Sequence, residues 1–267
     1  MFPCVLKALI FAYTLNMIFI VVFLAFVQGF CEFLPVSSSG HIVLLHKVFG
    51  LNCDVVSLNI ILHLATALSV VVMYRKQIWW YVTHPFSKQT LKLIIATALT
   101  CVFVLIFNSF ISDAINGKFL AISFLITAVI LLIATYVNKK YASGKPVNTV
   151  TAIVMGIFQG VAILPGISRS GTTLCSGLVC GSEKGEVADF SFIMSLPIIL
   201  IGAVYDFIFE KPNFAGFNAF LLILAFLVAF VCGVIAIKIT KQLTEKTKLW
   251  YFSIYLVVIS IICFIVL

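Results

Sequence analysis

Residues 28–41 read QGFCEFLPVSSSGH, and they place a glutamate, a histidine and three consecutive serines inside a chain that is otherwise apolar. A second stretch, QGVAILPGISRSGTT at residues 159–173, places an arginine in similar surroundings. Charged side chains within apolar segments are costly, and they are usually retained for a function. The two stretches are therefore the first candidates for a functional site and for breaks in regular helices.

The composition of the rest of the chain defines the surroundings of these stretches. Of the 267 residues, 63% are hydrophobic and 10% are charged, and the mean hydropathy is +1.23. Soluble domains carry about 25% charged residues. Apolar runs separated by short polar breaks indicate spanning helices rather than a barrel, so we predict an all-α integral membrane protein. The eight cysteines form no CxxC pair and are interpreted as small apolar residues.

The two polar stretches also match each other. QG at 28–29 corresponds to QG at 159–160, and SxSG at 37–40 corresponds to SxSG at 168–171. Both pairs are offset by 131 residues, about half the length of the chain, and a proline in each stretch falls one residue out of this register. The match predicts an internal duplication.

The predicted duplication divides one membrane domain into a first repeat (1–137), a cytoplasmic linker (138–148) and a second repeat (149–267). A crossing needs about 20 residues, and residues 150–164 are too few before a Pro-Gly break, so we expect each motif to lie on a re-entrant helical hairpin. Residues 8–30 are nevertheless long enough to span. Six crossings are predicted, at 58–74, 91–107, 119–137, 187–209, 214–239 and 250–267.

Three crossings in each half would invert the second repeat relative to the first. The charges agree with this topology, because it places most lysines and arginines on one side, which is then cytoplasmic. The opposite side receives only Lys118 and Lys211, offset by Asp113 and Glu210. The net charge of +8 therefore reflects topology and not nucleic-acid binding. The basic side carries Arg75, Lys76, Lys88, Lys92, Lys139, Lys140, Lys145, Lys241, Lys246 and Lys248.

The broken helices of inverted repeats meet near the middle of the bilayer. In each motif here a proline precedes serines and a glycine, and this order favours the start of a helix. Two helix N-termini and the guanidinium of Arg169 would form an anion site, for which phosphate is the best ligand.

The first motif also carries groups for chemistry. Ser37 and Ser38 lie four and three residues before His41, so one helical turn could place either hydroxyl beside the imidazole. Glu32 could orient that histidine or hold a metal ion. In the alternative, Ser37–Gly40 are ordinary helix-packing residues. Outside the motifs, we interpret His63 as a packing histidine, and as interfacial groups Glu183, Glu186, Asp189 and Asp206.

At these residues the chain resembles the bacterial undecaprenyl-diphosphate phosphatases linked to bacitracin resistance. The first motif of that family is matched here by Glu32-Phe-Leu-Pro-Val-Ser-Ser-Ser-Gly-His41, and the second by Pro165-Gly-Ile-Ser-Arg-Ser-Gly-Thr-Thr173. The similarity continues through Phe190-Ser191-Phe192 and Pro197.

The resemblance implies hydrolysis of undecaprenyl diphosphate to undecaprenyl phosphate and inorganic phosphate, which recycles the lipid carrier for peptidoglycan synthesis and confers bacitracin resistance. It implies Ser38 as nucleophile, His41 as its acid–base partner, Glu32 as an orienting or metal-assisting carboxylate and Arg169 as phosphate clamp. Residues implied to support the diphosphate are Gln28, Ser37, Ser39, Ser168, Ser170 and Thr173.

The resemblance also implies a divalent cation, Mg²⁺ or Ca²⁺, and a site that faces the outer side of the bacterial plasma membrane. The expected partners are the polyprenyl diphosphate and membrane lipids, and a homodimer is compatible with the sequence. One departure concerns the cation. Position 28 is Gln where many members have a second glutamate, which puts a two-carboxylate metal site in doubt.

The alternative function is a secondary transporter or flippase for an anionic lipid or phosphate, because an inverted repeat around a midplane anion site is transporter architecture. The Ser–His–Glu group favours an enzyme, since transport of an anion needs no nucleophile. A non-catalytic lipid-binding scaffold is a third hypothesis.

Overall fold

The computed structural model describes residues 2–50, 55–115, 119–141, 144–214 and 217–267, and across these ranges its regular structure is helical. The all-α class predicted from composition is confirmed. The helices are α1 (Phe2–Cys31), α2 (Ser38–Phe49), α3 (Val55–Met73), α4 (Arg75–Thr83), α5 (Lys88–Ile115), α6 (Leu120–Tyr141), α7 (Thr149–Val161), α8 (Arg169–Val179), α9 (Lys184–Phe209), α10 (Ala219–Glu245) and α11 (Trp250–Val266).

Five described helices, α3, α5, α6, α9 and α10, are long and apolar enough to cross a membrane. They coincide with five of the six predicted crossings. The sixth, residues 250–267, forms α11, which has 17 residues and falls just below the length of those five. The long apolar helices are consistent with an integral membrane protein.

The side chains are distributed as a membrane environment requires. Large apolar side chains such as Leu105 on α5 and Ile133 on α6 are exposed on the outside. Inside, hydroxyls join neighbouring helices: Thr100 donates to the carbonyl of Gly156, and Ser69 donates to that of Phe230, both at 2.9 Å. Small hydroxyl residues allow close helix packing and bond across it.

The helices follow the offset seen in the sequence. Adding 131 to the bounds of α2 gives 169–180, and α8 covers 169–179; adding it to α5 gives 219–246, and α10 covers 219–245. The two halves also interlock, because α1 packs on α10, α7 packs on α5, and α6 packs on α11. Two pairs of helices thus keep the offset of the repeated motif, and the duplication itself stays a prediction.

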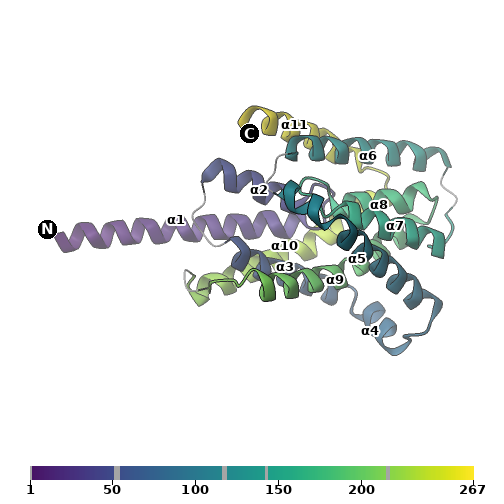
Figure 1. Cartoon of the computed structure of the whole chain (residues 1–267), viewed down its shortest axis with the longest axis horizontal. Helices are drawn as coiled ribbons and strands as arrows, with labels where there is room; N and C mark the ends of the chain where they lie inside the picture. The colour runs from purple at the N-terminus through teal and green to yellow at the C-terminus, as the bar shows by residue number, and fades with distance from the viewer. Residues whose placement is uncertain (1, 51–54, 116–118, 142–143, 215–216) are drawn as a thin grey trace.

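Each half contains a hairpin of helices in which one motif forms the turn. Figure 1 shows α2 lying back alongside α1, and α8 alongside α7. The helices α2, α7 and α8 have 12, 13 and 11 residues, well short of the roughly 20 that a crossing needs. Helix α1, in contrast, is one continuous helix of 30 residues.

The basic segments lie together at one end of the molecule. In Figure 1 this end holds α4, the connection between α6 and α7, and the junction of α10 with α11, while both termini lie at the other end. Lys92 donates to the carbonyl of Val147 at 2.6 Å, and Lys241 forms an ion pair of the same length with Asp189. Lys118, which was assigned to the opposite side, lies outside the described residues.

The residue that caps α2, Ser37, also joins the two hairpin turns. Ser37 precedes α2, and its Oγ accepts from the N–H of Gly40 at 3.3 Å and from the N–H of Gly166 in the other turn at 3.1 Å. Ser168 precedes α8 and caps it by accepting from Gly171 at 3.1 Å. The predicted helix starts at both motifs are confirmed. Ser37 has φ of 69°, a conformation that is costly for a residue with a side chain.

The turns approach so closely that a side chain would not fit between them. A Cβ placed on Gly40 would lie 2.8 Å from the backbone of Gly166 and 2.7 Å from the ring of Phe124. Gly166 itself has φ of 90°, which only glycine adopts readily. This contact sets the separation of the two motifs.

We expect Gly40→Ala to destabilise the protein strongly, because the added methyl group meets the backbone of Gly166 and cannot be relieved by a side-chain rotation. The thermal midpoint of the purified protein in detergent should fall by several degrees (~4 °C or more). Gly202→Ala is the matched control, since its Cβ would meet no atom within 4 Å. Equal midpoints for both variants would contradict the close approach of the turns.

Candidate active site

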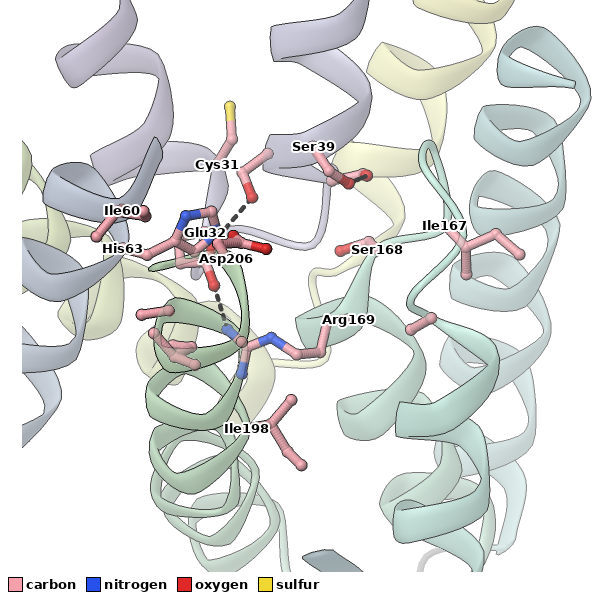
Figure 2. A pocket seen from close by; sticks show the side chains of 16 residues that line it. Cys31, Glu32, Ser39, Ile60, His63, Ile167, Ser168, Arg169, Ile198 and Asp206 are labelled. Carbon is pink, nitrogen blue, oxygen red and sulfur yellow. Dashed lines mark hydrogen bonds and ion pairs between the residues drawn. The ribbon is translucent and has the colours of Figure 1, made fainter. Parts of the chain in front are cut away.

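The turns of both hairpins line a cavity of about 180 Å³, together with residues of α3 and α9. Figure 2 shows Glu32 and Ser39 from the first motif and Ser168 and Arg169 from the second around this cavity. Its remaining walls are mostly apolar, and α9 contributes two isoleucines and two small residues to them. The cavity thus has a polar side formed by the turns and an apolar side formed by helices.

Glu32 is the centre of the polar side. Its Oε1 accepts from Nη2 of Arg169 at 2.6 Å, and its Oε2 accepts from the hydroxyl of Ser38 at 2.6 Å and from Nε2 of Gln28 at 2.9 Å. The Glu32 side chain is 6% exposed and that of Arg169 16% exposed. A carboxylate with so little contact to solvent needs this pairing to remain charged.

The fold places these groups through the ends of helices. Glu32 follows the last residue of α1, whereas Ser38 and Arg169 are the first residues of α2 and α8. Ser38 and Arg169 are 131 residues apart, so they occupy the same position in the two copies of the motif. The N-terminus of a helix carries partial positive charge and free N–H groups. Two helices of the hairpins therefore begin at the cavity, as a site for phosphate requires.

The predicted substrate-binding residues divide into two groups. Ser37, Ser39 and Ser168 line the cavity. The other three are absent from its described lining: Gln28 is buried and donates to Glu32, Ser170 donates to the carbonyl of Leu34 at 2.9 Å, and Thr173 lies 2.6 Å from the hydroxyl of Ser191. These three contacts hold the turns and α8 in place.

The predicted pairing of His41 with a serine hydroxyl is wrong. His41 Nδ1 lies 2.8 Å from the carbonyl of Ser37, and Nε2 lies 2.7 Å from the hydroxyl of Tyr255. A carbonyl only accepts, so Nδ1 donates and Tyr255 donates to Nε2. The ring also stacks on Tyr255 and contacts Phe124 edge-on, while Ser38 donates to Glu32 instead. In this structure His41 anchors α2 against α6 and α11.

Sequence reasoning missed two residues of the cavity. His63 on α3 was interpreted as a packing residue and Asp206 on α9 as interfacial, but both line the cavity. His63 Nε2 lies 3.9 Å from Oε2 of Glu32. Neither residue belongs to a recognisable motif, because each is surrounded by apolar residues. A polar or charged side chain inside a predicted span is itself a sign of function, and this sign could have identified both residues.

The residues of the site do not form a metal cage on their own. The described part of the chain contains no group of three or more His, Cys, Asp or Glu placed to hold a metal ion. Glu32 is the carboxylate at the centre, and both of its oxygens are already engaged by Arg169, Ser38 and Gln28. Position 28, where the resemblance led us to consider a second carboxylate, supplies an amide that donates to Glu32. We therefore do not assign Glu32 as a metal ligand.

A helical fold with long apolar spans, with a serine and an arginine at two helix N-termini and a buried carboxylate just after the end of α1, defines a membrane-embedded protein with a site suited to an anionic group. The family model described as "Bacitracin resistance protein BacA" matches residues 21–262. The chain belongs to this family and is a multi-pass membrane protein.

Relatives from distant organisms match along nearly the whole chain. A protein of Carboxydothermus hydrogenoformans named undecaprenyl-diphosphatase is 36% identical over 242 residues, which cover 89% of this chain and 93% of that protein. An undecaprenyl-diphosphatase of Thermosipho africanus is 35% identical, with 91% of this chain and 98% of the relative covered. Undecaprenyl-diphosphatase 1 of Shouchella clausii is 33% identical, with 91% and 94% covered.

Because Glu32 is already bound by Arg169, Ser38 and Gln28, we predict that the protein without substrate binds divalent cations weakly. Titration of the purified protein with Mn²⁺, followed by the loss of the free-ion EPR signal, should show no stoichiometric site at micromolar concentrations. Gln28→Glu adds a second carboxylate beside Glu32 and should create or strengthen Mn²⁺ binding. Tight stoichiometric binding to the unmodified protein would contradict our account of Glu32.

Proposed function

We propose that this chain is an undecaprenyl-diphosphate phosphatase, which hydrolyses undecaprenyl diphosphate to undecaprenyl phosphate and inorganic phosphate. One observation carries the proposal: the Ser38 hydroxyl lies 2.6 Å from the carboxylate of Glu32, beside Arg169, in a cavity with apolar walls. The names of the relatives support the same activity. A hydroxyl paired with a proton acceptor and facing a cation is suited to phosphoryl transfer.

Glu32, Ser38 and Arg169 have different roles in the proposed reaction. Glu32 accepts the proton of Ser38 as Oγ attacks the terminal phosphorus, and the bond from phosphorus to the bridging oxygen breaks. Undecaprenyl phosphate leaves, and water then releases phosphate from the serine. Arg169 uses one nitrogen for Glu32 and has further N–H donors for the phosphoryl oxygens. In the alternative route, a water molecule oriented by Ser38 attacks the terminal phosphorus directly. Glu32 and Arg169 keep the same roles in that route.

The cavity suits an amphiphile that stays in the bilayer. A long polyprenyl tail cannot leave the membrane, so its diphosphate has to be hydrolysed by a site within reach of the lipid. Ile198 and Ile199 of α9 form apolar lining opposite the serines of the turns. The diphosphate would lie against the helix N-termini and the first isoprene units against α9.

We further propose that the two repeats have inverted topology and that both hairpins are re-entrant. The basic segments at one end would then face the cytoplasm. The cavity includes Asp206, one turn before the end of α9 at Phe209, and the connection after α9 lies at the opposite end. The site would therefore face the outer side of the plasma membrane, where hydrolysis recycles the carrier for cell-wall precursors and lowers sensitivity to bacitracin.

In this proposal a divalent cation binds to the protein together with the diphosphate of the substrate. Diphosphate oxygens are hard ligands, and Mg²⁺ commonly binds through substrate phosphates while keeping several waters. The cation would offset part of the diphosphate charge and leave Glu32 available to Ser38. We derive no further step from it.

The test of the proposed function is phosphate release from a polyprenyl diphosphate by the purified protein in detergent. We expect Ser38→Ala to lower kcat by at least about 10²-fold, because the hydroxyl that Glu32 activates is removed. Ser195→Ala is the control, since this buried hydroxyl donates to the Phe192 carbonyl within α9 and is absent from the described cavity lining.

Two outcomes would redirect the proposal. Full activity of Ser38→Ala, with the variant folded, would exclude Ser38 as nucleophile. A wild-type protein that binds the lipid but releases no phosphate would favour transport of the anion. A ³²P-labelled phosphoserine trapped by acid quenching would separate the covalent route from direct attack by water.

The proposed topology predicts opposite protease accessibility for two connections. A protease cleavage sequence inserted after Gly144 should be protected in intact spheroplasts and cut after lysis, because that connection would be cytoplasmic. The same sequence inserted after Asn213 should be cut in intact spheroplasts. Cleavage of the first insertion in intact spheroplasts would contradict the assignment of the basic end to the cytoplasm.

A further inference from the structure

His63 lines the cavity, and its Nε2 nitrogen is directed into it. Its Nδ1 lies 2.8 Å from the carbonyl of Asn59, one turn earlier on α3. The carbonyl fixes the proton on Nδ1 and directs Nε2 toward the cavity, where it lies 3.9 Å from Glu32. The side chain is 32% exposed. Of the two histidines near the turns, His41 is engaged at both nitrogens away from the cavity, and His63 is the one that a ligand can reach.

Charged groups from two other elements face the His63 side of the cavity. Glu32 lies beside it at the turn after α1, and Asp206 interacts with it electrostatically from α9. Arg169 also lies in the cavity but is bound to Glu32. Helix α10, which packs on α3, contributes no residue to the described lining. Two carboxylates thus interact with His63, and the guanidinium of Arg169 lines the same cavity.

The charge of the cavity shows what His63 would add. With a neutral imidazole, Glu32, Asp206 and Arg169 give the described lining a net charge of minus one, which opposes a diphosphate. A protonated His63 brings the lining to neutrality, so that the two helix N-termini then favour the anion. Arg169 alone cannot do this because its charge is already balanced by Glu32.

We propose that His63 is a second phosphate-binding residue, which as an imidazolium donates from Nε2 to a non-bridging oxygen of the diphosphate together with Arg169. This inference rests on the proposed function, because the diphosphate is its ligand. It assigns direct contact with the substrate to the histidine of α3. The histidine of the first motif, His41, becomes a positioning residue that holds α2.

The test is binding of a non-hydrolysable diphosphate, farnesyl methylenediphosphonate, to the full-length protein in detergent by isothermal titration calorimetry. We expect His63→Ala to raise Kd about 10- to 100-fold, the loss typical of a hydrogen bond to a charged group. His63→Gln keeps an N–H donor and should lie between wild type and His63→Ala. His46→Ala, a histidine of α2 absent from the described cavity lining, should bind as wild type does.

Binding separates this inference from the proposed function. A Kd for His63→Ala within about 2-fold of wild type would overturn the assignment, provided that thermal unfolding shows a folded variant. Equal loss in His63→Gln and His63→Ala would also overturn the role as a donor. If wild type binds the analogue yet hydrolyses no polyprenyl diphosphate, the proposed function fails while the series of Kd values still decides the role of His63. Where hydrolysis is observed, His63→Ala should raise KM more than it lowers kcat.

Discussion

The ion pair between Arg169 and Glu32 is the contact on which the rest of the structure depends. It joins the turns of two hairpins from opposite halves of the chain at 2.6 Å, and both side chains are largely buried. Loss of either partner would leave the other charge unpaired in an apolar environment, at a cost of about 3–5 kcal/mol. The close contact of Gly40 with Gly166 and the bond from Gly166 to Ser37 hold the turns at the separation this pair needs.

The two copies of the motif contribute different groups to one site. Ser38 and Arg169 occupy equivalent positions, each directly after a serine that caps a helix. The shared backbone supplies two helix N-termini that suit an anion, whereas the side chains have diverged. The first half provides the carboxylate and the hydroxyl, and the second provides the cation. Neither half could both neutralise a phosphate and attack it, so the site exists only where the halves interlock.

The sequence predicted what depends on periodicity and local pattern. The apolar runs located the five long helices, with ends that differ by up to eight residues (107 predicted against Ile115 for α5). The repeated motif located both caps and the residues Glu32, Ser38 and Arg169 of one site. The sequence could not predict the hydrogen-bond partners of the two imidazole nitrogens of His41. His41 is within one turn of Ser38, but its nitrogens bond to Ser37 and to Tyr255, which is 214 residues away. His63 and Asp206 have no motif, and only the packing of α3 and α9 brings them to Glu32.

The two sides of the cavity restrict the ligands that it can hold. The polar side presents serines, Arg169 and helix N-termini, while α9 presents isoleucines and, at Gly202, open space where other residues would place a side chain. An inorganic anion would leave the apolar side in contact with water, and an uncharged lipid would leave the two helix N-termini without the anion that they favour. An amphiphile with a phosphate at its end satisfies both sides at once. The two sides of the cavity together therefore favour lipids that end in a phosphate or diphosphate over either kind of simpler ligand.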